Sequence, residues 1–345
     1  MRTPLPRGSS AGLVIAVVAA FTFGTSGSFA EPLLKAGWSP AAAVTVRALT
    51  GGILLAPLAA VLLRGRWRTL WTARWRILAM AMIGVAGTQL AYFAALETVP
   101  VGTAILLEYM APLLLVAFAW ATTRRIPQLV VLAGSAIALV GLILVVAPGG
   151  GKAPATIGIL FAVLAMIGCA VYYVVAAAPS DGLPPVAYAT ASLLIGGVVL
   201  GVVGASQLVP FEMTFGTVRM FGGTEPWWLP VLAIGLISTA IAYTTNITAS
   251  ELLGSRLASF LGLLEVVAAT FYAWILLGQA LALPQLLGGA LILAGIAFVR
   301  AERKPEPEPE PARAAALSGA DASPRTTASA GNTRPPKPAR LGGES

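Results

Sequence analysis

The segment Thr88-Gln89-Leu90-Ala91-Tyr92 lies in an apolar run, and Thr239-Ala240-Ile241-Ala242-Tyr243 repeats its pattern 151 residues later. Beyond it the spacing becomes 154, which pairs Trp120 with Trp274, Gly134 with Gly288 and Gly141 with Gly295. The chain is therefore an internal duplication. If each copy spans a membrane an odd number of times, the copies must enter the bilayer from opposite sides, as in the inverted repeats of secondary transporters.

The composition places the chain in a lipid bilayer. Apolar residues make up 57% and charged residues only 10% of it, with a mean hydropathy of +0.85, whereas charged residues are near a quarter of a soluble domain. A pI near 10.1 could suggest nucleic acid as a partner. The basic residues sit in short loops and form no basic face, so we expect no nucleic-acid binding.

Ten stretches are long and apolar enough, or nearly so, for a helix to cross a hydrocarbon core, which takes about 20 residues. They are 11–30, 38–63, 75–96, 99–121, 127–147, 155–178, 184–205, 227–247, 253–277 and 283–300. A β-barrel would instead show short alternating strands. We predict an all-α membrane protein with ten transmembrane helices in two inverted five-helix repeats.

This prediction divides the chain into four parts. A cytoplasmic N-terminus (1–10) precedes the first repeat (11–147), the second repeat (156–300) and a tail (301–345). Alternating Pro and Glu open the tail and small polar residues follow, so we expect it to be disordered. The rival interpretation of the N-terminus is a leader cleaved after Ala30, which would leave nine spans and break the symmetry of the duplication.

Lys and Arg in alternate loops predict the orientation, because positive loops stay cytoplasmic. One set of loops contains Arg2, Arg7, Arg64, Arg66, Arg68, Arg74, Arg76, Arg124, Arg125, Arg300, Arg303 and Lys304, and the other contains only Lys35, Lys152 and Arg219. We therefore expect a multi-pass protein of a bacterial-type inner membrane with both termini in the cytoplasm.

Three ionisable residues, Arg47, Glu108 and Glu265, lie well inside predicted spans, where a charge costs on the order of 2.5 to 3.5 kcal/mol. We expect them to face a wet cavity or a partner; the alternative is that Arg47 pairs with a carboxylate only to hold helices together. A carboxyl group in a low-dielectric cavity can exchange a proton near neutral pH. We therefore assign proton coupling to Glu265 and Glu108, and expect Pro112 to bend the helix beside Glu108.

Further polar side chains lie on the duplicated spans. We include Thr88, Gln89, Tyr92, Thr239, Tyr243 and Asn246, together with Arg47 and Glu108, in a predicted substrate site. Thr and Tyr four apart share one helical face in each repeat. Interhelical hydrogen bonds, worth about 0.6 kcal/mol each, are the alternative role for the uncharged residues.

Several features argue against an enzyme. Histidine is absent, which removes the commonest transition-metal ligand and the usual general base. The single cysteine, Cys169, has no base to activate it. We expect no cofactor and no bound metal.

The five-span unit resembles the EamA family of the drug/metabolite transporter superfamily. The resemblance rests on Arg47, on Ala91-Tyr92, and on Val101-Gly102-Thr103 leading through Leu107-Glu108-Tyr109 to Ala111-Pro112. With Thr98-Val99-Pro100, this run is most similar to the threonine and homoserine exporter branch. The resemblance implies a ten-helix carrier that exports small metabolites, often amino acids.

Two positions depart from the family pattern. The family usually has a glutamate at the ends of spans four and nine, where this chain has Arg125 and Gln279. A usual Glu-Pro pair appears here as Glu265-Val266, which keeps the carboxylate and loses the proline. We therefore expect no proton role at the span ends and a less bent ninth span.

The predicted function is export of small metabolites, most plausibly amino acids, by alternating access with proton coupling. The first alternative is efflux of hydrophobic cations, in which Arg47 would be structural. The second is a membrane scaffold that transports nothing. The expected partners are a small-molecule substrate and the lipid bilayer. The sequence leaves a homodimer, the substrate and the coupling ion open.

Overall fold

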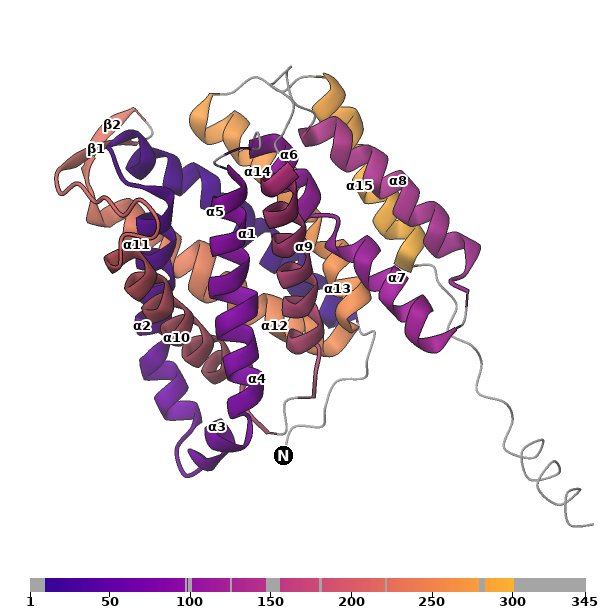
Figure 1. Ribbon diagram of the computed structural model, residues 1–345, viewed down its shortest axis with the longest axis horizontal. Helices are drawn as coiled ribbons and strands as arrows, with labels where there is room; N and C mark the ends of the chain where they lie inside the picture. Colours follow the sequence, from indigo (N-terminus) through magenta and orange to yellow (C-terminus); the bar gives the residue numbers. More distant parts are fainter. Residues whose placement is uncertain are drawn as a thin grey trace, which may run out of the picture. The chain divides into compact units, whose positions relative to one another are not determined.

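The computed structural model describes residues 10–96, 98, 101–124, 126–146, 156–179, 182–220, 222–278 and 283–300, and these are mostly helical (Figure 1). The first half contains α1 (Ser10–Lys35), α2 (Pro40–Leu62), α3 (Arg68–Thr72), α4 (Arg74–Ala79), the π-helix η1 (Met80–Gly87), α5 (Thr88–Leu96), α6 (Val101–Glu108), α7 (Ala111–Thr123) and α8 (Leu129–Val146). The second half contains α9 (Thr156–Ala176), α10 (Pro185–Ala205), β1 (Thr217–Met220), β2 (Gly223–Pro226), α11 (Trp228–Gly235), the π-helix η2 (Leu236–Ile241), α12 (Ala242–Leu253), α13 (Ser255–Gly262), α14 (Leu264–Leu277) and α15 (Leu283–Arg300).

Helix length and composition show a membrane protein. Within the described residues, seven helical stretches are long and apolar enough to cross a bilayer: Ser10–Lys35, Pro40–Leu62, Arg74–Ala95, Thr156–Ala176, Pro185–Ala205, Trp228–Leu253 and Ser255–Leu276. Three shorter apolar helices are Ala111–Thr123, Leu129–Leu144 and Leu286–Val299. Each lies mostly within one of the stretches expected from the sequence.

The eighth predicted stretch ends too early. We expected it to end at residue 247, but α12 continues to Leu253. The added turns contain Ser250 and Glu251, whose polarity resembles the end of a span. Both side chains have partners inside the protein, Asn246 for Ser250 and Arg76 for Glu251, and these partners keep the two residues within the helix.

A two-stranded antiparallel hairpin, β1–β2, stands between α10 and α11 and adds a small exception to the all-α prediction. Gly222 at its turn has φ 87°, which a residue with a Cβ rarely adopts. Val218 packs with Leu33, Trp38 and Val231 at the end of α1. Strands of four residues in a polar loop leave too little alternation for the sequence to predict them.

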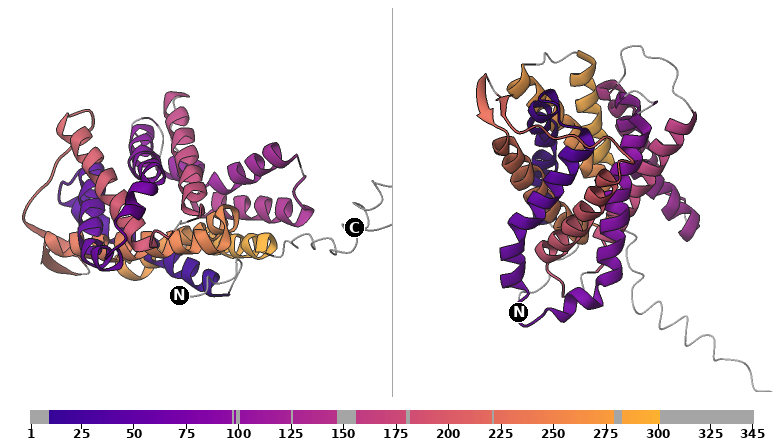
Figure 2. Two further views of the ribbon diagram at one scale, coloured as in Figure 1. Left: turned by 90° about the horizontal axis from the view of Figure 1, so that it is seen from below. Right: turned by 60° about the vertical axis from the view of Figure 1, so that its left-hand side comes forward.

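The helix α1 defines two ends of the bundle. Near its start, Gly12 lies against Leu253 at the end of α12. Near its finish, Leu33 packs on the hairpin. We call the first the α12 end and the second the hairpin end; α3 and α4 lie at the α12 end, and α6 lies toward the hairpin end (Figures 1 and 2).

The duplicated Thr-x-x-Ala-Tyr motif has the same local geometry in both halves. The Thr88 hydroxyl donates to the Ile83 carbonyl at 2.8 Å, and the Thr239 hydroxyl donates to the Ile234 carbonyl at 2.9 Å. Both bonds reach five residues back, at the last turn of a π-helix. Such single-turn π segments are rare and often occur at functional sites.

Glycines place α8 and α15 in close antiparallel contact. A Cβ at Gly134 would lie 2.8 Å from the carbonyl oxygen of Gly295, and one at Gly141 would lie 2.6 Å from that of Gly288. Gly134 corresponds to Gly288 in the duplication, and Gly141 to Gly295. The contacts are therefore reciprocal, the pattern of a two-fold related interface.

The helices α2 and α10 repeat this reciprocity. They begin at Pro40 and Pro185, which sets a spacing of 145. Gly52 lies against Leu194, and its counterpart Gly197 lies against Leu49. The absence of a Cβ lets both helix pairs approach closely, as small residues do in membrane helix interfaces.

Some predictions fall outside the described residues. They concern residues 1–9, Val99 and Pro100, Arg125, the turn at 147–151 with Lys152, Gln279, and the tail 301–345.

Candidate functional site

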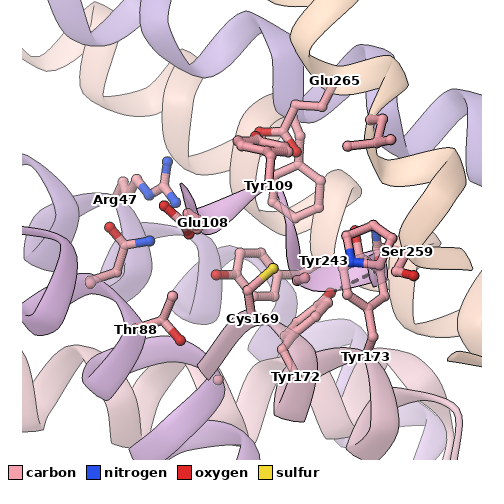
Figure 3. Close-up of a pocket in the computed structure, with 17 residues that line it drawn as sticks. Arg47, Thr88, Glu108, Tyr109, Cys169, Tyr172, Tyr173, Tyr243, Ser259 and Glu265 are labelled. Carbon is pink, nitrogen blue, oxygen red and sulfur yellow. Dashed lines mark hydrogen bonds between the residues drawn. The ribbon is translucent and has the colours of Figure 1, made fainter. Parts of the chain in front are cut away.

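A cavity of about 110 Å³ lies between the two halves and is lined from α1, α2, η1, α5, α6, α7, α9, α12, α13 and α14 (Figure 3). Seven of the predicted site residues line it: Arg47, Thr88, Gln89, Glu108, Tyr243, Asn246 and Glu265. They lie far apart in the sequence, and the packing of the two halves brings them together.

Glu108 reaches the cavity because its helix ends there. The helix α6 stops at Glu108, and α7 starts at Ala111 with Pro112 in its first turn. Proline has no N–H for a helical bond, and its ring disfavours a continuous helix. The predicted bend beside Glu108 is confirmed, as a break at Tyr109 and Met110.

Glu265 also lies beside a helix break. The helix α13 ends at Gly262, and α14 begins at Leu264, so Glu265 stands in its first turn, where a carboxylate interacts favourably with the helix dipole. We expected this span to be less bent because it lacks a proline. The helix is interrupted all the same, at the single residue Leu263, whereas the break beside Glu108 takes in Tyr109 and Met110. At the break, two backbone hydrogen bonds span three residues instead of the four of an α-helix. They run from Leu263 N to Phe260 O and from Val266 N to Leu263 O, both at 3.1 Å.

Arg47 is held by neutral partners. Its Nη1 donates to Ser26 Oγ at 2.6 Å, and the Tyr243 hydroxyl is a second hydrogen-bonding partner. Within the described part of the chain, no carboxylate oxygen lies within 4.0 Å of its guanidinium nitrogens. Glu108 lies near enough for charge interaction (Figure 3). The guanidinium therefore keeps capacity for an anion from outside.

The remaining wall is aromatic and contains residues that the sequence did not single out. Tyr172 meets Tyr173 and Tyr243 edge to face, with ring centroids 5.2 and 5.9 Å apart. The Tyr172 hydroxyl donates to Asn246 Oδ1 at 3.1 Å. Phe23 packs edge to face on Tyr243 at 5.1 Å. These aromatic residues sit in apolar runs, so their type alone does not separate a cavity wall from a lipid-facing surface.

Tyr109 is a further residue that sequence reasoning missed. It occupies the break between α6 and α7, and its side chain lies beside Glu265 at the cavity (Figure 3). This proximity brings the break in the first half next to the break in the second half. Its position directly after Glu108 was the only signal in the sequence.

Two predicted site residues do not line the cavity. Thr239 is fully buried against α2, where a Cβ at Gly51 would lie 2.7 Å from its Cγ2. Tyr92 packs in a separate cluster with Ala95, Ala104 and Ala162. The shared helical face was inferred from an α-helical period, but helices from the other half cover one member of each pair.

Metal ligands do not gather at this site. In the ranges that the structure describes, no group of three or more His, Cys, Asp and Glu side chains could hold a metal ion. The cavity therefore presents one guanidinium, two carboxyl groups, hydroxyls and amides, a set suited to binding a small polar solute.

A membrane protein that encloses such a polar cavity between its helices is typical of a solute carrier. Residues 10–147 and 156–301 match the EamA-like transporter family, and the chain belongs to this family. The family model therefore matches the chain twice.

Relatives with assigned names are transporters. The chain is 27% identical over 209 residues to an uncharacterized transporter of Archaeoglobus fulgidus, covering 61% of this chain and 70% of the relative. It is 24% identical over 304 residues to the uncharacterized inner membrane transporter YicL of Salmonella typhimurium, covering 84% and 94%. Neither name specifies a substrate.

A solved crystal structure of a protein has a similar fold. Its TM-score is 0.68 at 22% identity, over 84% of this chain and 97% of that one. The similarity extends to the fold alone.

Proposed function

We propose that the protein is an inner-membrane carrier whose two five-span halves are inverted relative to each other and rock around the central cavity. The reciprocal glycine contacts of α8 with α15, and the equivalent π-helices η1 and η2, support a two-fold relation between the halves. The arginine-rich segment from Arg64 to Arg76 favours a cytoplasmic location for the α12 end. Both termini are then cytoplasmic.

The substrate in this proposal is a small zwitterion such as an amino acid. Arg47 binds the carboxylate, Glu108 binds the ammonium group, and Glu265 carries the coupling proton. The main support for this assignment is that one cavity contains these three groups, while the guanidinium makes no close ion pair with a described carboxylate. A bound zwitterion would place its carboxylate beside the guanidinium and its ammonium group beside a carboxyl group, so that each buried charge gains a partner.

The size of the cavity also supports a small substrate. At about 110 Å³ it is well below the 300 to 1,000 Å³ of cavities that bind drug-sized ligands. A small metabolite fits such a volume better than a polycyclic cation does.

We propose that a cluster at the α12 end closes the cytoplasmic route into the cavity. Arg76 of α4 binds Glu251 of α12, with 3.0 Å between Nη2 and Oε1. It also donates to carbonyls at the end of α9. We propose that these bonds open when the carrier turns to the cytoplasm.

Transport by purified protein in liposomes tests the assignment. We expect Arg47→Gln and Glu108→Gln to abolish both exchange and net transport of the amino acid that gives the largest thermal stabilisation in a panel. Glu265→Gln should abolish net transport driven by a pH gradient and retain exchange, because exchange moves no proton. Arg74→Gln serves as the control, since Arg74 is half-buried and its Nη1 donates to the Trp71 carbonyl of the same segment at 3.0 Å. Unchanged transport in both Arg47→Gln and Glu108→Gln would sink the proposal.

A second candidate, efflux of hydrophobic cations, is favoured by the aromatic wall. Phe23, Tyr109, Tyr172, Tyr173 and Tyr243 line the cavity together with two carboxyl groups, and aromatic faces attract cations. In this case quaternary ammonium compounds would compete where amino acids do not, and Arg47→Gln would bind them more tightly.

A further inference from the structure

A second cavity, of about 280 Å³, adjoins the central one. The two share Phe23, Tyr109 and Glu265 as lining residues. The second is formed by α1, α6 and α14, and its volume exceeds that of the central cavity. These three side chains are therefore a partition between two chambers.

The second cavity lies on the hairpin side of the partition. In α1 its lining continues from Phe23 to Gly27, toward Leu33 and the hairpin. In α14 it continues from Glu265 to Thr270. The Arg76 cluster lies at the other end of the bundle, so the second cavity is on the side opposite to the closed route.

The chemistry of the second cavity differs from that of the central one. Both contain the Glu265 carboxyl group, but no Lys or Arg is among the described residues that line the second cavity. Its polar atoms are few: Ser26 Oγ accepts from Arg47, and the Thr270 hydroxyl donates to the Val266 carbonyl at 2.8 Å. The aromatic rings of Phe23 and Tyr109 flank the carboxyl group.

A carboxyl group between aromatic rings, in an otherwise apolar chamber without a cationic side chain, suits an organic ammonium ion. The ring faces attract the cation, and the apolar wall accommodates its hydrocarbon part. No Lys or Arg is among the described residues that line the chamber, and the Arg47 guanidinium beyond Ser26 is bound to the Ser26 hydroxyl, so the chamber favours a cation over an anion.

We propose that the second cavity is a separate binding site for organic ammonium groups, which a solute occupies between the central cavity and the hairpin end. Its role in transit rests on the proposed transport function. Binding of an ammonium ion can be measured without any transport.

Gly27 provides the test. It lines the second cavity and not the central one, and a Cβ built on it meets no atom within 4 Å. Gly27→Leu therefore places a bulky side chain, whose Cβ has open space, at the wall of the chamber, while Gly27→Ala adds one methyl group there and is the matched control. Thr270→Leu narrows the same chamber from α14 and serves where Gly27→Leu fails to fold.

The probe is benzyltrimethylammonium, with benzyl alcohol as its neutral counterpart, titrated calorimetrically into the full-length protein in detergent. We expect the wild type and Gly27→Ala to bind the cation alike, Gly27→Leu to bind it at least tenfold more weakly, and benzyl alcohol to bind far more weakly than the cation. Thermal unfolding of Gly27→Leu should match that of Gly27→Ala, so that weaker binding reflects the filled chamber and not a loss of fold.

Three results would overturn the proposal: no cation binding by the wild type, equal binding by Gly27→Leu and the wild type, or equal affinity for the alcohol and the cation. Loss of amino-acid transport in Arg47→Gln is a separate result. It tests the proposed function and leaves the cation measurement interpretable by itself.

Discussion

Arg76 and Glu251 form an ion pair of 3.0 Å that joins α4 of the first half to α12 of the second. The same guanidinium donates to the carbonyls of Val175 and Ala176 at 3.0 and 3.2 Å, at the end of α9, where the last carbonyls of a helix lack their usual helical partners and the Val175 carbonyl also accepts from Ala178 N in a turn. It also lies over the Tyr188 ring, 4.3 Å from its centroid. One side chain of the first half thus binds three helices of the second.

Removal of this side chain should destabilise the fold. The ion-paired side chains of Arg76 and Glu251 are only 13% and 19% exposed. Arg76→Gln leaves a carboxylate and several carbonyls unpartnered, so we expect a loss of about 1 to 3 kcal/mol in unfolding free energy. Thermal unfolding in detergent measures it. Arg74→Gln, at a nearby site without an ion pair to a described carboxylate, should change stability by no more than about 0.5 kcal/mol; equal effects of the two variants would contradict the role of the cluster.

Opening of this cluster should be visible at Cys169. It is the sole cysteine of the chain and lines the central cavity, so the protein carries a natural reporter. In vesicles of known orientation, a membrane-impermeant thiol reagent added at the α12 end should modify Cys169 several-fold faster in Arg76→Ala than in the wild type or Arg74→Ala. Identical rates in all three proteins, measured by mass spectrometry, would exclude Arg76 as a barrier on that side.

The α8–α15 contact gives a prediction about packing. Gly141→Ala places a Cβ 2.6 Å from a carbonyl oxygen, so backbone must move, and we expect a loss of about 1 to 3 kcal/mol. The control is Gly289→Ala in α15, whose Cβ meets Val267 at an ordinary 3.7 Å. Alanine is the better helix former by about 0.8 to 1 kcal/mol, so this variant should be as stable as the wild type or more so. The melting temperatures of the two variants decide the matter.

The sequence identified the charged residues of the cavity correctly, but it did not show which uncharged residues line the cavity. Arg47, Glu108 and Glu265 could be found because a charge within an apolar span is costly anywhere except at a cavity or partner. Thr239 was grouped with them by period alone. Whether a polar group on a helix faces the cavity or a neighbouring helix depends on packing with the other half, which the period does not encode.

The helix breaks show the same limit. Pro112 predicts the break beside Glu108, because the proline ring and its missing N–H disfavour a continuous helix whatever the neighbouring helices are. The break before Glu265 has no such residue. We attribute it to Gly262, which lets Tyr173 of α9 approach so closely that a Cβ there would clash with the Tyr173 hydroxyl oxygen. Such a contact between the ninth and sixth predicted spans cannot be read from either segment alone.

That contact leads to a prediction on coupling. Gly262→Ala should displace Tyr173 from the cavity wall and destabilise the protein by about 1 to 3 kcal/mol. Tyr173→Phe removes the clashing oxygen, and the next ring atom, Cζ, lies 3.1 Å from the added methyl group. By itself it removes a buried hydroxyl group, for which we expect a change of about 1 kcal/mol. Because the two substitutions share one contact, the double variant should be less destabilised than the sum of the single variants, by about 0.5 to 3 kcal/mol. Additive losses in thermal unfolding would show that Gly262 and Tyr173 do not meet, and that the second break has another cause.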